Sequence, residues 1–417
     1  MKNILIIYPH WPPSNLAGVH RARLIANYLS EFEWHPVVLS VHPDCYEEPH
    51  DWDLLKTVSD KIEVHFVKAF KVRKPRIIGD IGLRSFFQLK QAALEIIKQK
   101  KIEFIWIPIP SFYIAILGRV LFNKTKIPYG IDYIDPWVRD ISNRKNLRAI
   151  LSNAIARLLE PYAIKKASLV SGVAEAYFKP AIERNFRKMK PVQVAMPYGF
   201  DRNDHLIRIE NIFYPWSEYK ACKPYIYAGA FLPLSGLFIN LLCKALRDLK
   251  NLEILDPDVR LFFIGTGNYN HKSIAEYAEE YGVNDIVIEI RDRFPFLHVL
   301  NFLSGAKGVL LIGSTEEHYT ASKTFQSVLS GRPVFSILHY KSTAVEIFKK
   351  CKADAYLCEY EPDQGIEIFY ENIKIIFSDF LDEKKVYEPD FNILENYSAK
   401  QSANSLIKAI NSINYKK

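Results

Sequence analysis

The chain has 417 residues, of which 49% are hydrophobic and 24% charged, and its formal net charge is +8. This length predicts two or three domains, and the composition excludes an intrinsically disordered chain. Residues 1–200 hold 30 Lys and Arg against 18 Asp and Glu (net +12), whereas residues 201–417 hold 25 against 29 (net −4). The asymmetry indicates two domains with different partners. The basic half suits an anionic substrate or an anionic membrane surface, and no nucleic-acid-binding motif is present.

The cysteines and the N-terminus indicate a cytoplasmic location. The cysteines are scattered and none has metal-ligand spacing, so we expect reduced thiols and no metal site. The first apolar run, Ile4–Tyr8, is too short for a signal peptide, and no stretch approaches the roughly 20 apolar residues of a spanning helix. We therefore expect a cytoplasmic protein, with attachment to the inner face of the cytoplasmic membrane as one alternative. The cysteines are Cys45, Cys222, Cys243, Cys351 and Cys358.

The first half of the chain alternates between apolar runs typical of buried strands and amphipathic stretches typical of helices. This alternation predicts a parallel, doubly wound sheet. The expected elements are, in chain order, a strand at Ile4–Tyr8, a helix from Val19, strands at Val37–Val41 and Ile62–Val67, a helix over about Ser85–Lys100, a strand at Phe104–Ile107, a helix near Tyr113–Phe122, a strand from Pro128, a helix over Ala149–Lys166, and strands at Ser168–Ser171 and Val192–Ala195.

The loop after the first strand is a candidate binding loop. It contains three prolines and Gly18, and the helix that follows begins with His20, Arg21 and Arg23. A glycine-containing loop before a basic helix start predicts a phosphate or sugar cradle, although a single glycine is weak evidence beside a full G-x-G-x-x-G motif. The alternative is an exposed basic helix after a rigid turn.

Two carboxylates follow the apolar strand from Pro128. Asp132 and Asp135 stand where Pro136 ends that strand, so we expect them at the carboxyl edge of the sheet. A carboxylate there can take a proton from a sugar hydroxyl or orient an acceptor. The alternative is that Asp135 caps the following turn.

A basic and aliphatic stretch lies between residues 68 and 84. Lys68, Lys71, Arg73, Lys74, Arg76 and Arg84 alternate there with Phe70, Ile77, Ile78 and Leu83. Such a stretch can lie against anionic headgroups. An ordinary solvated loop and helix start is the alternative.

The second half repeats the architecture after a polar, aromatic stretch. We expect a domain boundary and hinge over residues 201–223, because the alternation fades there. The expected elements are a strand at Pro224–Gly229, a helix through Leu249, a strand from Val259 that ends in the loop Gly265-Thr-Gly267, a helix to about Tyr281, a strand at Asp285–Ile290, a helix from about Phe296, strands at Gly308–Ile312 and Val334–Leu338, and a last helix over Ser398–Ile413.

The stretch Thr320–Val334 is the strongest functional signal. It predicts a short helix from Ser322 to about Ser330, because Phe325, Val328 and Leu329 share a face and Gly331 stops it. Lys323 would stand in the first turn, where the helix dipole disfavours a cation. A bound anion would remove that conflict. The alternative is a solvated lysine on a surface helix.

The chain resembles the GT-B glycosyltransferases, most closely glycosyltransferase family 4. The resemblance covers nearly the whole length and lies in the order and spacing of its motifs. These are Pro12-Pro13…Gly18-Val-His-Arg21, Asp132…Asp135-Pro-Trp137, Tyr198-Gly-Phe-Asp201, Tyr227-Ala-Gly229, Gly265-Thr-Gly267, and Ser322-Lys323…Gly331-Arg-Pro-Val334.

The resemblance implies an α/β fold of two Rossmann-like doubly wound domains that face a central cleft. It implies an acceptor-binding domain over residues 1–200, a nucleotide-sugar-binding domain over 224–392, and a C-terminal helical segment, 393–417, that packs back toward the first domain. It also implies sugar transfer with retention of anomeric configuration and without a metal or cofactor, since the nucleotide-diphosphate sugar is a co-substrate. The implied catalytic residues are Asp135, Asp132 and Lys323. The implied donor-binding residues are Gly229, Gly265, Gly267, Arg291, Glu316, His318, Ser322, Lys323 and Gln326, and the acceptor-binding residues are Gly18, His20, Arg21 and Arg139.

The sequence departs from the family pattern at the positions that usually hold charged donor-binding groups. Two family glutamates correspond to His318 and Gln326, and Glu316 and Glu317 stand just upstream. The Arg and Lys that usually hold the diphosphate correspond to Ala230 and Ser235, and a His near the first-domain carboxylate corresponds to Ile134. A metal-free transfer needs cations beside the leaving diphosphate, so Lys323, with Arg291 or Arg293, would have to supply them.

Three functions are consistent with these features. We expect a hexosyltransferase-class enzyme that moves a sugar from a nucleotide-diphosphate donor to a saccharide or lipid-linked saccharide in cell-surface polysaccharide synthesis, with peripheral contact to an anionic membrane as one alternative. The missing charged residues favour a second hypothesis, an inactive GT-B scaffold or sugar-binding partner in polysaccharide assembly. A third is another nucleotide-binding enzyme of the same architecture, such as a sugar epimerase.

Overall fold

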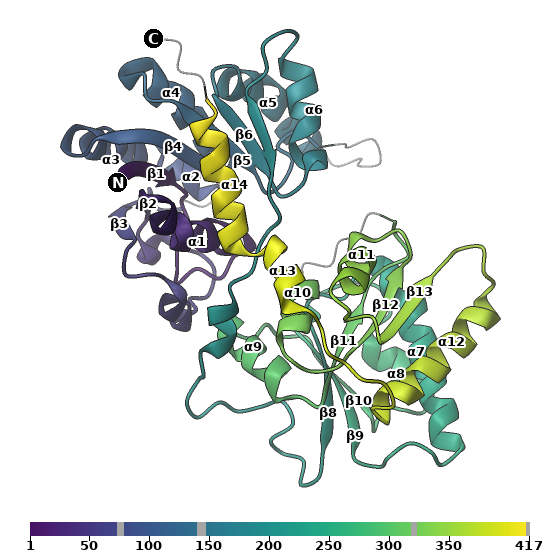
Figure 1. The fold of residues 1–417 in the computed structure, drawn as a ribbon. Helices are drawn as coiled ribbons and strands as arrows, with labels where there is room; N and C mark the ends of the chain where they lie inside the picture. The colour runs from purple at the N-terminus through teal and green to yellow at the C-terminus, as the bar shows by residue number, and fades with distance from the viewer. Residues whose placement is uncertain (73–78, 140–146, 318–322, 414–417) are drawn as a thin grey trace. The chain divides into compact units, whose positions relative to one another are not determined.

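The computed structural model describes residues 1–72, 79–139, 147–317 and 323–413, and the chain forms two compact units (Figure 1). Unit 1 comprises residues 1–201 and 397–417, and unit 2 comprises residues 202–396. The chain therefore leaves unit 1, completes unit 2 and returns to unit 1 for its last helix.

Unit 1 is built on a parallel sheet of seven strands in the order β3-β2-β1-β4-β5-β6-β7. The first strand along the chain, β1, is central, and its neighbours β2 and β4 pair with it in parallel. Both faces are covered, which explains why β1, β2 and β4 are almost continuously apolar. The strands are β1 (Lys2–Ile7), β2 (Trp34–Val41), β3 (Glu63–Val67), β4 (Ile102–Ile109), β5 (Tyr129–Tyr133), β6 (Leu169–Gly172) and β7 (Val192–Ala195).

The helices of unit 1 include one from the far end of the chain. Helix α14 (Ala399–Asn411) packs beside α1, as Figure 1 also shows, and Ala403, Leu406 and Ile410 are part of the unit 1 core. The amide of Ala399 donates to the Phe200 carbonyl at 2.8 Å. The other helices are α1 (Ala17–Leu29), α2 (Ile81–Arg84), α3 (Phe86–Gln99), α4 (Ala115–Thr125), α5 (Leu147–Ile164) and α6 (Glu175–Asn185).

Unit 2 is built on a parallel sheet of six strands in the order β10-β9-β8-β11-β12-β13. Its first strand, β8, is again central, so the two units share one winding pattern. The strands are β8 (Lys223–Ala228), β9 (Val259–Ile264), β10 (Val287–Ile290), β11 (Gly308–Ile312), β12 (Val334–His339) and β13 (Tyr356–Tyr360).

The helices of unit 2 pack on both faces of this sheet. The polar stretch in which we expected a hinge starts with a short 3-10 helix, η5 (Arg202–Leu206), which packs against α9 within unit 2. The helices are α7 (Gly236–Asn251), α8 (Ile274–Glu280), α9 (Phe296–Gly305), α10 (Lys323–Leu329), α11 (Thr343–Lys350), α12 (Ile366–Leu381) and α13 (Phe391–Leu394). Across the described residues, no helix combines the length and apolar character that a membrane span requires.

Candidate functional site

Each sheet has one position where the strand order reverses direction. In unit 1 it lies between β1 and β4, and in unit 2 between β8 and β11. In doubly wound sheets the loops diverge at this point, and ligands bind there at the carboxyl ends of the strands. Gly229 and Glu316 lie in the loops after β8 and β11, whereas the other predicted site residues that the structure describes lie in helices or strands or in the loops after β5, β9 and β10.

Lys323 lies at the reversal point of unit 2. Its side chain reaches back from the start of α10 to the loop after β8. Its Nζ donates to the Tyr227 hydroxyl at 2.8 Å and to the Ala230 carbonyl at 3.3 Å, and it lies 4.2 Å from the centre of the Tyr227 ring. Burial lowers the pKa of Lys323 from 10.5 to about 7, and no charged neighbour among the described residues offsets that effect. An anion bound beside this amine would restore its positive charge.

Gly229 makes room for that lysine. Its φ is +131°, and a Cβ at this position would lie 2.1 Å from Lys323 Cε and 2.4 Å from Nζ. Gly265, with φ of +66°, follows β9, and its own Cβ position is 3.9 Å from the Gly229 Cα. Any other residue at 229 would have to displace the lysine side chain.

Arg291 belongs to the neighbouring loop, after β10. Its carbonyl accepts from the Gly267 amide at 3.1 Å, which ties this loop to the loop after β9. Its exposed guanidinium lies 4.6 Å from the centre of the Tyr269 ring. The Tyr269 hydroxyl donates in turn to Glu289, which also accepts from Thr266 at 2.7 Å. The edge of unit 2 thus carries a second, positioned cation.

The remaining predicted donor residues fall into different surroundings. Gln326 is hydrogen-bonded to His205 of η5. Glu316 is exposed, and its amide bonds to the Ser314 hydroxyl at 3.3 Å. Ser235 is buried and donates to the Gly313 carbonyl, so its hydroxyl is used within the fold. The predictions for His318 and Ser322 lie outside the described residues.

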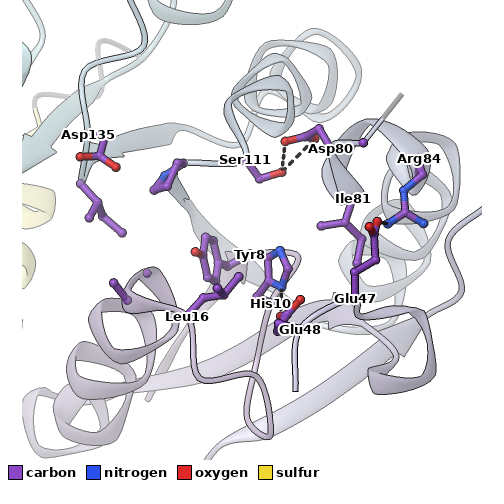
Figure 2. Close-up of a pocket in the computed structure, with 15 residues that line it drawn as sticks. Tyr8, His10, Leu16, Glu47, Glu48, Asp80, Ile81, Arg84, Ser111 and Asp135 are labelled. Carbon is purple, nitrogen blue, oxygen red and sulfur yellow. Dashed lines mark hydrogen bonds and ion pairs between the residues drawn. The ribbon is translucent and has the colours of Figure 1, made fainter. Parts of the chain in front are cut away.

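A pocket of about 390 Å³ opens at the reversal point of unit 1 (Figure 2). Gly18 and Asp135, two of the predicted acceptor-side residues, line it. Gly18 is required for space, because a Cβ there would lie 2.0 Å from the Tyr8 hydroxyl oxygen. The other polar lining residues were not predicted, and they are Tyr8, His10, Glu47, Glu48, Asp80, Arg84 and Ser111.

Glu48 is the centre of one hydrogen-bonded group in this pocket. It accepts from Ser14 and lies 2.8 Å from Nδ1 of His10 (Figure 2). Burial opposes ionisation of the Glu48 carboxyl, but the hydrogen bonds from His10 and Ser14 outweigh it and lower its pKa to about 2. The carboxylate therefore stays ionised and holds the imidazole in place.

The opposite side of the pocket carries a second carboxyl group, whose pKa is raised where that of Glu48 is lowered. Asp80 accepts from the Ser111 hydroxyl at 3.1 Å. Burial raises the pKa of Asp80, although the Leu83 amide and Ser111 partly oppose it. Arg84 bonds to Glu47 at 2.9 Å on the same side (Figure 2). The pocket thus combines carboxyl groups of different proton affinity with an imidazole and a guanidinium.

Asp132 and Arg21 form a buried pair. Both side chains are 0% exposed, with Arg21 Nε 3.0 Å from one Asp132 oxygen and Nη2 3.1 Å from the other. Ser171 also donates to Asp132 at 2.6 Å, and Arg21 bonds to the carbonyls of Met196 and Pro197. These contacts join β5, β6, α1 and the end of β7 inside unit 1. We therefore assign to this pair a structural role, in place of the catalytic and acceptor-binding roles expected from the sequence.

His20 and Arg139 also lie away from the pocket lining. Burial and the nearby Arg23 lower the pKa of His20 to about 3, so its imidazole is neutral. Arg139 is exposed, stacks over Phe112 at 5.8 Å, and lines a different hollow beside Trp137. Of the four predicted acceptor residues, only Gly18 lines the same pocket as Asp135.

The fold of the chain is GT-B, with two Rossmann-like units, as expected from the sequence. No protein-family model matches the sequence, and no curated protein matches it either. Solved structures match along the whole length. HepE of Anabaena in complex with UDP has a TM-score of 0.56 at 13% identity, with 99% of this chain and 100% of that chain covered. A glycosyltransferase from Rickettsia africae has a TM-score of 0.59 at 13% identity, covering 100% and 99%.

The same architecture is shared with an enzyme of another class. A structure of a putative UDP-N-acetylglucosamine 2-epimerase from Listeria monocytogenes has a TM-score of 0.52 at 12% identity, with 99% of this chain and 96% of that chain covered. At these identities the likeness establishes the fold alone. The function must therefore be argued from the residues of the two sites.

Proposed function

We propose that the chain is a glycosyltransferase that moves a sugar from a nucleotide-diphosphate donor to a saccharide or lipid-linked acceptor in cell-surface polysaccharide synthesis. The observation that carries the proposal is Lys323, whose amine is held at the reversal point of unit 2 by Tyr227 and Ala230 with a pKa of about 7. A lysine that has no charged partner among the described residues suits a ligand that brings its own negative charge. The similar structures include a glycosyltransferase and, separately, HepE in complex with UDP, and these support the donor class.

In this proposal unit 2 binds the donor. The backbone of Gly229, Gly265 and Gly267 allows close approach of the diphosphate, and Lys323 and Arg291 supply positive charge. As the bond between the sugar C1 and the diphosphate oxygen breaks, negative charge builds on the leaving group. A cation placed beforehand stabilises that charge without reorganisation, so neither a metal nor a cofactor is invoked.

Unit 1 binds the acceptor in its pocket. Asp135 orients the acceptor hydroxyl and receives its proton as the oxygen bonds to C1 on the face from which the diphosphate departs, so that the anomeric configuration is retained. The ionised Glu48 fixes His10, which donates to or accepts from further sugar hydroxyls. We place the transfer in the retaining class and the enzyme among family 4, on the motif order described above, and we place it in the cytoplasm.

The test combines a donor screen with two matched lysine variants. The wild type is incubated with UDP- and GDP-sugars, and turnover and thermal stabilisation are measured. We expect Lys323→Ala to lower kcat by about 10²–10³-fold while the protein stays folded. Lys349→Ala, an exposed residue of the same unit that pairs with Glu359, should leave the rate unchanged. Equal rates for the wild type and Lys323→Ala would refute the assignment.

Two observations favour a second candidate, an inactive sugar-binding scaffold. The Ser235 hydroxyl donates its hydrogen bond to the Gly313 carbonyl, and Ala230 contributes only a backbone carbonyl, which accepts from Lys323. Ala230 and Ser235 stand where the resemblance implies an Arg and a Lys that bind the diphosphate. Neither position therefore supplies a cation. Stabilisation by a nucleotide sugar without turnover on any acceptor would favour the scaffold, whereas release of an isomerised sugar nucleotide would favour an epimerase.

A further inference from the structure

Helix α5 of unit 1 is apolar on the side that faces outward. Its inner side, with Ala156, Ala163 and Ile164, is buried in the core. On the outer side, Leu151 is 64% exposed, Leu158 75% and Tyr162 45%. These three residues are seven and four positions apart, so they share one face. An ordinary surface helix carries polar side chains there, and a helix that is apolar all round is usually covered.

No acidic side chain interrupts this face. Glu160 is the one Asp or Glu in the sequence of α5, and it is 1% exposed. Its carboxylate accepts from Arg184 at 2.9 Å and from Asn185 at 3.1 Å, both on α6. The negative charge of the helix is therefore turned inward and neutralised.

A basic hollow adjoins the C-terminal end of the helix. It has a volume of about 1010 Å³, and its described lining residues include no Asp or Glu. Lys165, Lys166 and Lys190 line it together with Tyr162 and Met189. Met189 is 84% exposed, in the exposed loop Arg187-Lys-Met-Lys190 that precedes β7. An apolar stripe thus continues into a cationic rim with an exposed methionine.

We propose that this surface, comprising the outer face of α5 and the loop 187–190, docks in the interfacial plane of an anionic lipid bilayer. Its apolar side chains would enter the headgroup and acyl boundary, and its lysines would meet lipid phosphates. A second copy of the chain fits less well, because a two-fold contact would set the same basic rims against each other.

The location is compatible with acceptor binding. The hollow lies where β6 and β7 begin, beside Ser168 and Val192. The pocket of unit 1 lies at the opposite edge of the sheet, so a membrane at α5 would leave it open. The inference rests on the proposed function in one respect: a lipid-linked acceptor would explain why the protein binds a membrane. Its test needs no turnover, so either proposal can fail without the other.

The experiment is co-sedimentation of the full chain with phosphatidylcholine vesicles that contain 0 or about 30% phosphatidylglycerol. We expect binding only to the anionic vesicles, weakened by salt. Leu151→Gln/Leu158→Gln should lower the partition coefficient about tenfold, and Lys165→Gln/Lys190→Gln should lower it about fivefold per lysine. All four substituted side chains are exposed to solvent, so we expect the variants to fold, and near-UV circular dichroism verifies the fold of each.

Two control variants match these changes in chemistry. Ile368→Gln/Ile375→Gln removes exposed side chains from α12 of unit 2, and Lys68→Gln/Lys71→Gln removes charges from the basic stretch of unit 1. Both should bind like the wild type. Equal binding by the α5 variants, or loss only in Lys68→Gln/Lys71→Gln, would overturn the proposal. A third contrary outcome is that the wild type forms a dimer and does not bind vesicles, while Leu151→Gln/Leu158→Gln is monomeric.

Discussion

Lys323 connects the chemistry of the donor site to pH. Its amine is mostly neutral above pH 7 in the free protein, because burial favours the uncharged form. A diphosphate beside it would stabilise the ammonium and raise its pKa. Nucleotide binding therefore couples to proton uptake in the range above pH 7, and affinity falls as the pH rises through that range.

We predict that the wild type takes up protons on binding UDP at pH 8, up to about one per UDP. Calorimetry in two buffers of different ionisation enthalpy measures this number. Lys323→Met should bind more weakly and take up almost no proton. If the variant retains the full uptake, another group titrates and the lysine does not face the phosphates.

The buried pair of Arg21 and Asp132 illustrates the limit of residue-level prediction. The sequence correctly placed Asp132 at the end of an apolar strand, where catalytic carboxylates often occur. However, the two residues are 111 positions apart, and nothing local distinguishes an exposed carboxylate from one neutralised by a distant arginine. A signal was available for Asp132, since its charge lies within an otherwise apolar strand, where the cost of burial demands a partner.

At the scale of elements, the loops after β8 and β9 position the donor site through their glycines. Gly229 is the most constrained, because its φ is +131° and the Lys323 side chain occupies the space of a Cβ. We predict that Gly229→Ala displaces the lysine and lowers the affinity for a nucleotide diphosphate at least about tenfold. Titration calorimetry measures the affinity.

Gly331 provides the matched control for this prediction. Its φ is +71°, yet no heavy atom lies within 4 Å of its Cβ position. Gly331→Ala should therefore cost about 1–2 kcal/mol of stability through backbone strain, with unchanged nucleotide affinity. Similar affinities for the two variants would mean that Gly229 matters only for backbone conformation.

Much of the element order could be predicted, because parallel strands buried on both faces are short apolar runs. The predicted strands at Gly308–Ile312 and Val192–Ala195 have the observed bounds, and the helix from Phe296 begins where expected. The pocket of unit 1 was harder to foresee. Glu48 and Asp80 lie in loops after β2 and β3, without periodicity, and only the crossover order of the sheet brings them beside β1.

At the scale of the whole molecule, unit 2 is an insertion between two parts of unit 1. Residues 202–396 form a contiguous unit, whereas residues 1–201 lack α14, which supplies Ala403, Leu406 and Ile410 to their core. We predict that the isolated segment 202–396 folds cooperatively, and that 1–201 alone does not.

Thermal unfolding monitored by circular dichroism tests both segments. Adding a peptide of residues 397–417 to the segment 1–201 should restore a cooperative transition, because it returns the missing helix. A cooperative transition of 1–201 without the peptide would show that α14 is dispensable for folding. Failure of 202–396 to fold would show that it depends on the rest of the chain.

The return of α14 also dictates an order of events on the ribosome. Domains usually fold as they emerge, N-terminal part first. Here residues 1–201 remain with one flank of their sheet uncovered until residues 397–417 are translated. Unit 2 is translated later but is contiguous in the sequence, so it can fold before unit 1 is complete. A stalled or prematurely terminated nascent chain would therefore expose apolar surface in residues 1–201. We expect chaperones to bind mainly to that part of the chain.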